Sequence, residues 1–285
     1  MKHQEFEQRI EKYLKRQFGI TITVASKRQV YEALMNTVRE KLSEKKFAYE
    51  QELKKTKQKR AYYMSMEFLV GRTLRNNLFN LGIEKETKEY LEKNNFNLDE
   101  IYDIEPDPGL GNGGLGRLAS CYLDALTSSD YPVTGFSILY EYGIFKQVIN
   151  NGWQQEFPDY WLDLGKYGLV YRNDEEIEVR FYGHVEEKMT EDGFKVEHKD
   201  YTSIQAEPYD LLISGYKTKT VNTLRLWEAK AKTGFNMKLF ERGEYSKSSE
   251  AEAIASSISK LLYPADSTNE GKELRIKQQY FFISA

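Results

Sequence analysis

Apolar residues recur at helical spacing through the first sixty positions of the chain. Residues 6–14 predict a first helix, and Ser26 with Gln29 forms a capping-box pattern that predicts the start of a second one. The apolar stripe of this second helix consists of Tyr31, Leu34, Met35, Val38 and Leu42. We interpret the lysine-rich stretch 45–60 as a solvated helical face or linker, with a polyanion site as the alternative.

The pattern changes at residue 61, where strand-forming aromatic residues begin. The run AYYMSMEFLV (61–70) predicts a buried strand that leads into a tight turn. Helical segments are expected from Leu74 to Ile104, and the first of them should end at Gly82. A strong helix is predicted after the glycine cluster 109–116, with one face formed by Leu115, Leu118, Ala119, Tyr122, Leu123 and Leu126. Cys121 on this helix is expected to be a packed, unreactive thiol.

Strands dominate from Pro132 onward. Alternating residues end at the turn Asn150-Asn151-Gly152, and three short strands over 176–201 include a hairpin turn at Asp192-Gly193. Ser249 and Glu252 predict a capped helix whose apolar face holds Ile254, Ile258, Leu261 and Leu262. Because helical and strand segments are interleaved, the expected class is α/β with an inserted antiparallel meander.

The last predicted helix starts near Gly271 and stops in the apolar run 280–283. No Gly, Asn or Pro follows this run, and we expect Tyr280, Phe281, Phe282 and Ile283 to be exposed. This pattern favours the front part of a longer protein. The alternative is a C-terminal helix docked by its aromatic residues.

Composition narrows the class of protein. The 285 residues suit one large or two modest domains, and 40% hydrophobic residues exclude wholesale disorder. The net charge of −3 argues against duplex nucleic acid as the main partner. The single cysteine excludes an internal disulfide framework, and the three histidines lack the spacing of metal ligands. With neither a secretory signal nor an apolar run of about 18 residues, a cytoplasmic protein without membrane partners is expected.

The glycine-rich loop 109–117 (GLGNGGLGR) is the sharpest chemical feature. Glycines allow positive φ and close approach of a ligand, and the helix that follows directs free N–H groups at the loop, which favours an anion such as phosphate. The loop matches G-x-G-x-x-G twice, but the preceding residues 104–108 form a poor strand and no Gly-Lys-Ser/Thr is present. Tight helix–strand packing around the glycines is the alternative.

Glu67 is a second candidate, because it lies at the end of the apolar run 61–70. An acid there is costly to bury unless it is paired or used. Its place at the carboxyl end of a strand favours a role in a site, whereas an ion pair with Arg72 or Arg75 is the structural alternative.

Seven longer motifs occur in order: MSMEFLVGRTLRNNL (64–78), DPGLGNGGLGRLASCYLD (107–124), YEYGIFKQ (140–147), NGWQQEFPDYWL (151–162), VRFYGHV (179–185), VNTLRLWEAKA (221–231) and LYPADSTNEGKELRIKQQYFF (262–282). Together they resemble the glycogen/α-glucan phosphorylases from about Tyr31 to the last residue. The resemblance implies the N-terminal part of a GT-B-type glycosyltransferase fold, a parallel sheet with flanking helices. We expect an N-terminal helical segment, 1–60, and a partial α/β domain, 61–285, with the C-terminal cofactor domain absent.

The resemblance also implies an activity. Such enzymes use pyridoxal phosphate and inorganic phosphate to release the terminal glucose of an α-1,4-glucan as glucose 1-phosphate, and they form homodimers. The implied catalytic residues are Glu67 and Asp266. Substrate or phosphate binding falls to Gly113, Gly114, Leu115 and Ser267, and cofactor binding falls to Asn112, with no metal.

Some residues depart from the family pattern. Ser267 stands where the family often has a sugar-binding Asn, Leu69 stands where animal enzymes often have Tyr, and the phosphorylatable leader of animal enzymes is missing. The family's cofactor lysine lies beyond Ala285, so the chain alone is expected to be inactive and to bind no cofactor. A phosphate or sugar-phosphate binding module and a dimerisation module are the alternative functions.

Overall fold

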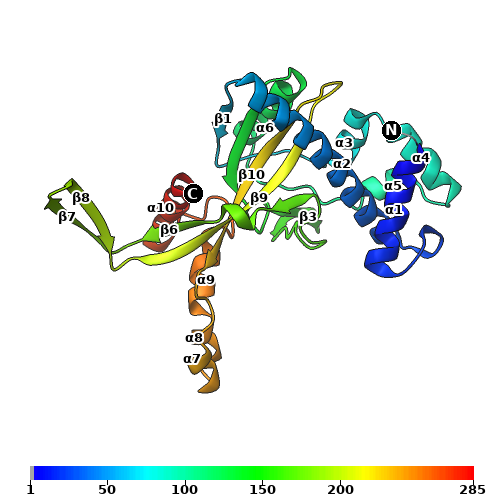
Figure 1. Cartoon of the computed structure of the whole chain (residues 1–285). Helices are drawn as coiled ribbons and strands as arrows, with labels where there is room; N and C mark the ends of the chain where they lie inside the picture. Colours follow the sequence, from blue (N-terminus) through cyan, green and yellow to red (C-terminus); the bar gives the residue numbers. More distant parts are fainter. Residues whose placement is uncertain (1–2) are drawn as a thin grey trace. The chain divides into compact units, whose positions relative to one another are not determined.

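The computed structural model describes residues 3–285 (Figure 1). These residues form two compact units. The first unit contains the chain up to Ser137 together with Glu141–Val170 and Asp210–Leu226. The second unit contains Ile138–Tyr140, Tyr171–Tyr209 and Trp227–Ala285.

Helices make up the first half of the first unit. They are α1 (His3–Phe18), the 3₁₀ turn η1 (Ile22–Val24), α2 (Lys27–Thr56), α3 (Leu74–Leu81), α4 (Glu84–Lys93), α5 (Leu98–Tyr102) and α6 (Gly114–Ser128). The predicted capping box is confirmed, because the Ser26 hydroxyl accepts a hydrogen bond from the Gln29 N–H while the Gln29 side chain accepts one from the Ser26 N–H. Gly82 ends α3 in the left-handed conformation, as predicted.

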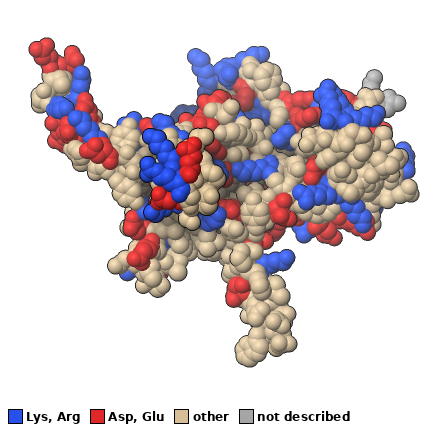
Figure 2. Space-filling model, turned by 90° about the horizontal axis from the view of Figure 1, so that it is seen from below, with Lys and Arg blue, Asp and Glu red and all other residues tan. Residues whose placement is uncertain are grey.

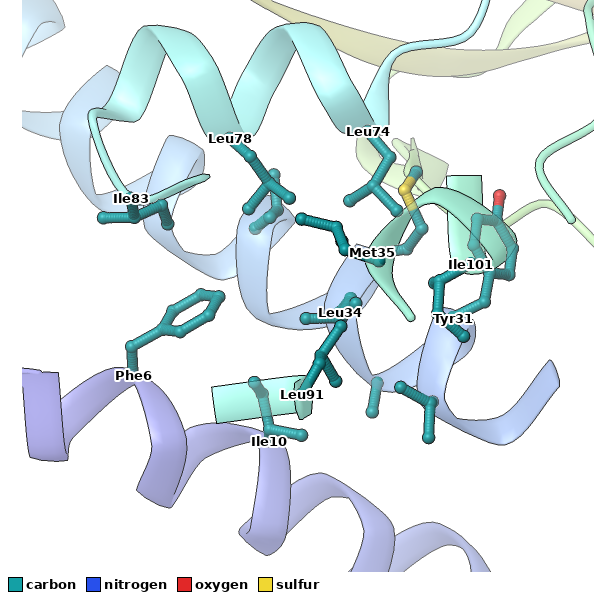
Figure 3. Packing of buried hydrophobic residues seen from close by; sticks show 14 of the residues in the cluster. Phe6, Ile10, Tyr31, Leu34, Met35, Leu74, Leu78, Ile83, Leu91 and Ile101 are labelled. Atoms are coloured by element: carbon teal, nitrogen blue, oxygen red, sulfur yellow. The ribbon is translucent and has the colours of Figure 1, made fainter. Parts of the chain in front are cut away.

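One apolar cluster holds these helices together. Figure 3 shows side chains of α1, α2, α3 and the helices that follow converging on it, among them Ile10, Leu34, Leu74, Leu91 and Ile101. The predicted stripe of α2 is fully buried. The helix runs on through the lysine-rich stretch as far as Thr56 and buries Tyr49 and Leu53, so residues 45–56 are a helical face rather than a linker.

The main sheet confirms the α/β class. From one edge, neighbouring strands are paired in the order β1 (Ala61–Met64), β2 (Val133–Ile138), β10 (Val221–Ala231), β9 (Thr202–Ser214) and β5 (Leu169–Tyr171). β1 and β2 are parallel, with Ala61 opposite Val133. The predicted burial of β1 is wrong: most of its residues are exposed, because β1 is at the edge of the sheet.

Helix α6 packs on the sheet through a different face from the predicted one. Ala119 and Leu123 are buried as expected, but Leu115, Leu118 and Tyr122 are exposed. Cys121 is also exposed, so the expectation of a packed thiol is wrong. The buried side uses small residues instead, and a Cβ on Gly135 of β2 would come within 3.3 Å of the Leu123 side chain. Because the helix and the strand approach closely, the residues between them must be small. A search of the sequence for large apolar residues at helical spacing therefore finds the wrong face of the helix.

Two hairpins form where the sequence predicts turns. In the first unit, β3 (Lys146–Asn150) pairs with β4 (Trp153–Phe157), and both Asn151 and Gly152 have positive φ at the turn between them. In the second unit, β7 (His184–Thr190) pairs with β8 (Gly193–Lys199), while β6 (Ile177–Phe181) is antiparallel to β9 after the 3₁₀ turn η2 (Asn173–Glu175). Figure 2 shows charges of both signs intermingled on the β7–β8 hairpin, at its upper left.

The second unit ends in four helices, α7 (Met237–Glu241), α8 (Tyr245–Ser248), α9 (Glu250–Ser257) and α10 (Asn269–Ser284). The cap predicted at Ser249 is wrong: its side chain caps nothing, because α8 ends directly before it. Helix α9 stops at Ser257, and only Ile258 and Leu262 of the predicted stripe are buried.

Helix α10 starts with Thr268 as its N-cap, close to the predicted position. Its last turn differs from the expectation of an exposed apolar run. Phe281 and Phe282 are buried, and the Tyr280 hydroxyl donates a hydrogen bond to the Arg180 carbonyl at 2.7 Å. The helix is therefore docked by its aromatic residues, although Tyr280 and Ile283 keep large exposed surfaces.

Glu105 provides a test of the helical core. Its buried carboxylate accepts hydrogen bonds from the Thr73 N–H, the Thr73 hydroxyl and the Leu74 N–H, and so caps α3. We expect Glu105→Ala to lower the free energy of unfolding by about 1–3 kcal/mol, because it leaves buried donors without an acceptor. Urea unfolding measures this change. Glu100→Ala, on the exposed face of α5, is the control and should cost well under 1 kcal/mol; equal losses would contradict the capping role.

Candidate functional site

The glycine-rich loop leads directly into α6, as predicted, but none of its glycines has positive φ, and three of them are needed for packing. A Cβ on Gly111 would lie 2.9 Å from the Leu69 side chain, and one on Gly116 would lie 3.1 Å from the Glu67 side chain. A Cβ on Gly109 would lie 3.3 Å from the Ile144 backbone nitrogen. These three glycines therefore let neighbouring segments approach closely. The packing interpretation holds for them.

Glu67 lies beneath this loop. Its side chain is only 6% exposed, and one carboxylate oxygen accepts a hydrogen bond from the Asn112 N–H at 2.9 Å. The predicted alternative, an ion pair with Arg72 or Arg75, is wrong: Arg72 pairs with Asp103 at 3.0 Å and Arg75 pairs with Glu84 at 3.7 Å. The carboxylate satisfies a loop amide instead.

Backbone hydrogen bonds on either side of Glu67 complete the attachment. The Phe68 N–H donates to the Leu110 carbonyl at 2.8 Å, and the Leu69 N–H donates to the Gly116 carbonyl at 3.0 Å. The segment after β1 is therefore bonded both to the loop and to the first turn of α6. These bonds place Glu67 where its carboxylate can hold the backbone of the glycine-rich loop in one conformation.

The part of the glycine-rich loop that leads into α6 is open to solvent. Asn112, Gly113, Gly114 and Leu115 are exposed, and a Cβ built on either Gly113 or Gly114 meets nothing within 4 Å. No side chain in the described part of the chain caps the N-terminus of α6. Free amides and the positive end of the helix dipole therefore face outward, which suits an anionic ligand such as phosphate.

A cavity of about 350 Å³ lies along α6 in the same unit, and Arg117, at the end of the loop, is one of its lining residues. Arg72, Arg117 and Asp124 are among its lining residues, and burial raises the pKa of the Asp124 carboxyl, with Arg117 opposing the shift. These residues were missed as candidates. A signal did exist, because Arg117, Ser120 and Asp124 follow one another at helical spacing on α6.

Asp266 and Ser267 belong to the second unit, whereas the glycine loop belongs to the first. Both are exposed in the loop before α10, where Asp266 forms an ion pair with Arg275. The Thr268 side chain accepts a hydrogen bond from the Gly271 N–H at 3.1 Å, and a Cβ on Gly271 would overlap the Ala265 carbonyl oxygen. Local packing thus fixes both ends of the loop that carries Asp266.

The structure brings Glu67, Asn112, Gly113, Gly114 and Leu115 together in one unit. Over residues 3–285 it contains no cluster of His, Cys, Asp and Glu side chains that could hold a metal ion. Over the same residues, no helix combines the length and apolar character required to cross a membrane.

Comparison with known proteins gives a consistent result. The family model described as carbohydrate phosphorylase matches residues 91–285. A glycogen phosphorylase of Chlamydia pneumoniae is 44% identical over 262 residues, which is 92% of this chain and 32% of that protein. The brain and muscle forms of human glycogen phosphorylase are 44% and 43% identical over the same length, 31% of each protein. The chain thus spans about a third of the length of the curated relatives it matches.

The two classes of glycine in the loop should respond differently to a methyl group. We expect Gly111→Ala to lower the free energy of unfolding by about 1–3 kcal/mol, because the new Cβ would be forced against Leu69 and Glu67. Gly114→Ala should leave stability unchanged or raise it by about 0.5 kcal/mol, since it opens a helix without steric conflict. Thermal and urea unfolding of the two variants measure the difference. A destabilised Gly114→Ala would show that this glycine too is required for packing.

Proposed function

The chain belongs to the carbohydrate phosphorylase family, and from that premise we propose that it forms one wall of the active site of an α-glucan phosphorylase. The reaction cleaves the terminal α-1,4 bond of a glucan with inorganic phosphate and yields glucose 1-phosphate. The observation that carries the proposal is the open N-terminus of α6 at Gly113 and Gly114.

In this proposal the loop amides bind the phosphate that attacks the glucan. Backbone N–H groups at a helix N-terminus stabilise negative charge without having to reorganise as the reaction proceeds. Leu115, the first exposed side chain of the helix, lies beside the sugar, and Glu67 keeps the loop in its binding shape through Asn112. Asp266 and Ser267 keep the catalytic and substrate-binding roles that the family resemblance implies for them.

The residues present also fit a phosphate-bearing cofactor, because the loop offers uncapped amides beside an exposed Asn112 side chain. Pyridoxal phosphate, when bound, would supply a phosphate group that can give a proton to the substrate phosphate and take it back. Asn112 would lie next to this cofactor. We further propose the GT-B architecture for the whole enzyme, with assembly as a homodimer and a cytoplasmic location.

Phosphate binding tests the loop directly. We expect ³¹P NMR titration of the chain to show binding of glucose 1-phosphate that Gly114→Ala weakens about tenfold or more, because a Cβ would stand where the phosphate oxygens approach the amides. Leu118→Ala, farther along α6 and also exposed, is the control and should bind as the unchanged chain does. Equal binding by Gly114→Ala would contradict this role of the loop.

Turnover separates catalysis from simple phosphate binding. We expect a polypeptide in which this chain is joined to the rest of a phosphorylase to release glucose 1-phosphate from maltodextrin only when inorganic phosphate is present. Gly114→Ala should lower kcat about 10²-fold with little change in Tm, since it removes transition-state stabilisation by the loop. If the joined polypeptide binds phosphate but releases no glucose 1-phosphate, the chain functions as a phosphate-binding module instead.

A further inference from the structure

The β3–β4 hairpin is outside the main sheet and is exposed on both sides. All ten residues of Lys146–Asn150 and Trp153–Phe157 are exposed, although the two strands pair in full register from Lys146–Phe157 to Asn150–Trp153. An isolated two-stranded hairpin has little intrinsic stability in water. The hairpin therefore presents side chains without burying an apolar face of its own.

The register assigns these side chains to two different faces. One face carries the aromatic residues Trp153 and Phe157 together with Val148, Asn150, Gln155 and, opposite Phe157, Lys146. Trp153 is 78% exposed, which is unusual for the largest apolar side chain of the hairpin. The opposite face carries Gln147, Ile149, Gln154 and Glu156, and has no aromatic ring.

The hairpin also lacks charge over nine consecutive residues, from Gln147 to Gln155. Charged residues make up 30% of the chain, and the β7–β8 hairpin carries many of both signs. Around Trp153 the exposed aromatic surface is uncharged and matches a neutral partner, and its one charged residue, Lys146, lies opposite Phe157 at the base of the hairpin. Two side-chain amides, those of Asn150 and Gln155, share the face with the rings, and amides both donate and accept hydrogen bonds, as sugar hydroxyls do.

The root of the hairpin is attached to the glycine-rich loop. The Ile144 N–H donates to the Gly109 carbonyl at 3.0 Å, and the Gly143 N–H donates to the Asp159 carbonyl at 2.9 Å. The rings of Tyr142 and Tyr160, one on each side of this root, lie 5.6 Å apart. Aromatic residues thus continue from the hairpin towards the beginning of the loop.

We propose that the face of the β3–β4 hairpin carrying Trp153, Phe157, Asn150 and Gln155 binds an α-glucan chain. The inference rests on the proposed function for the choice of a glucan, and adds a surface that holds the polymer away from the phosphate-binding amides. The apolar C–H face of a glucose ring stacks on the Trp153 indole, and the amides of Asn150 and Gln155 bond to its hydroxyls.

Binding of maltoheptaose by the chain tests the proposal in the absence of phosphate. We expect titration to change the intrinsic tryptophan fluorescence, and Trp153→Ala to raise the Kd about tenfold, as is typical when a central aromatic contact is removed. Trp153→Phe should recover part of the affinity, and Gln155→Ala should raise the Kd by a smaller factor. Ile149→Ala, on the opposite face of the same hairpin, is the matched control and should bind as the unchanged chain does.

Three results would overturn the proposal. The first is that the unchanged chain does not bind maltoheptaose, or that the Trp153→Ala variant binds it as tightly as the unchanged chain does. The second is that Trp153→Ala and Ile149→Ala lose the same amount of affinity. The third is conversion of a dimer to a monomer by Trp153→Ala in light scattering, which would assign the face to a second copy of the chain. Because glucose 1-phosphate binding is measured separately on Gly114→Ala, failure at the hairpin is distinguishable from failure of the proposed function.

Discussion

The hydrogen bond from the Asn112 N–H to the buried carboxylate of Glu67 is the contact on which the candidate site depends. A buried carboxylate must be satisfied, and here its partner is a loop amide rather than a cation. This partner ties the end of the β1 segment to the glycine-rich loop. Because Gly111 and Gly116 have no Cβ, the loop and the helix can approach the carboxylate closely enough to form the contact.

The same motif therefore combines two physical roles that look identical in the sequence. Gly111 and Gly116 are glycines because side chains pack against them, whereas Gly113 and Gly114 face open space at the start of α6. The packed pair makes the open pair rigid, since bonds on both sides of Glu67 leave the loop little freedom. A rigid set of free amides loses little entropy when it binds an anion, which is the physical basis of preorganisation.

Much of the fold could be predicted from the sequence, because capping, turn chemistry and apolar spacing act locally. The capping box at Ser26 and the Asn151-Gly152 turn are examples. Features that depend on distant neighbours could not be predicted. The exposure of β1 depends on its place at the sheet edge, and the buried side of α6 depends on the close approach of Gly135. Within the site, the sequence identifies the loop and Glu67 as candidates. It does not predict that Glu67 bonds to the Asn112 N–H, because every residue type except proline has a backbone N–H.

The charges around the loop indicate how an anion would be held. Arg72 is paired with Asp103, and the Arg117 guanidinium donates to the Leu69 carbonyl at 3.3 Å and lines the same cavity as Asp124. The chain as a whole carries a net charge of −3. The loop's own attraction for phosphate must therefore come from amides and the helix dipole, whose favourable energy falls off within the first turn. Amides orient a phosphate and stabilise its charge only in part, so two phosphates in one closed site would require cations from outside the loop.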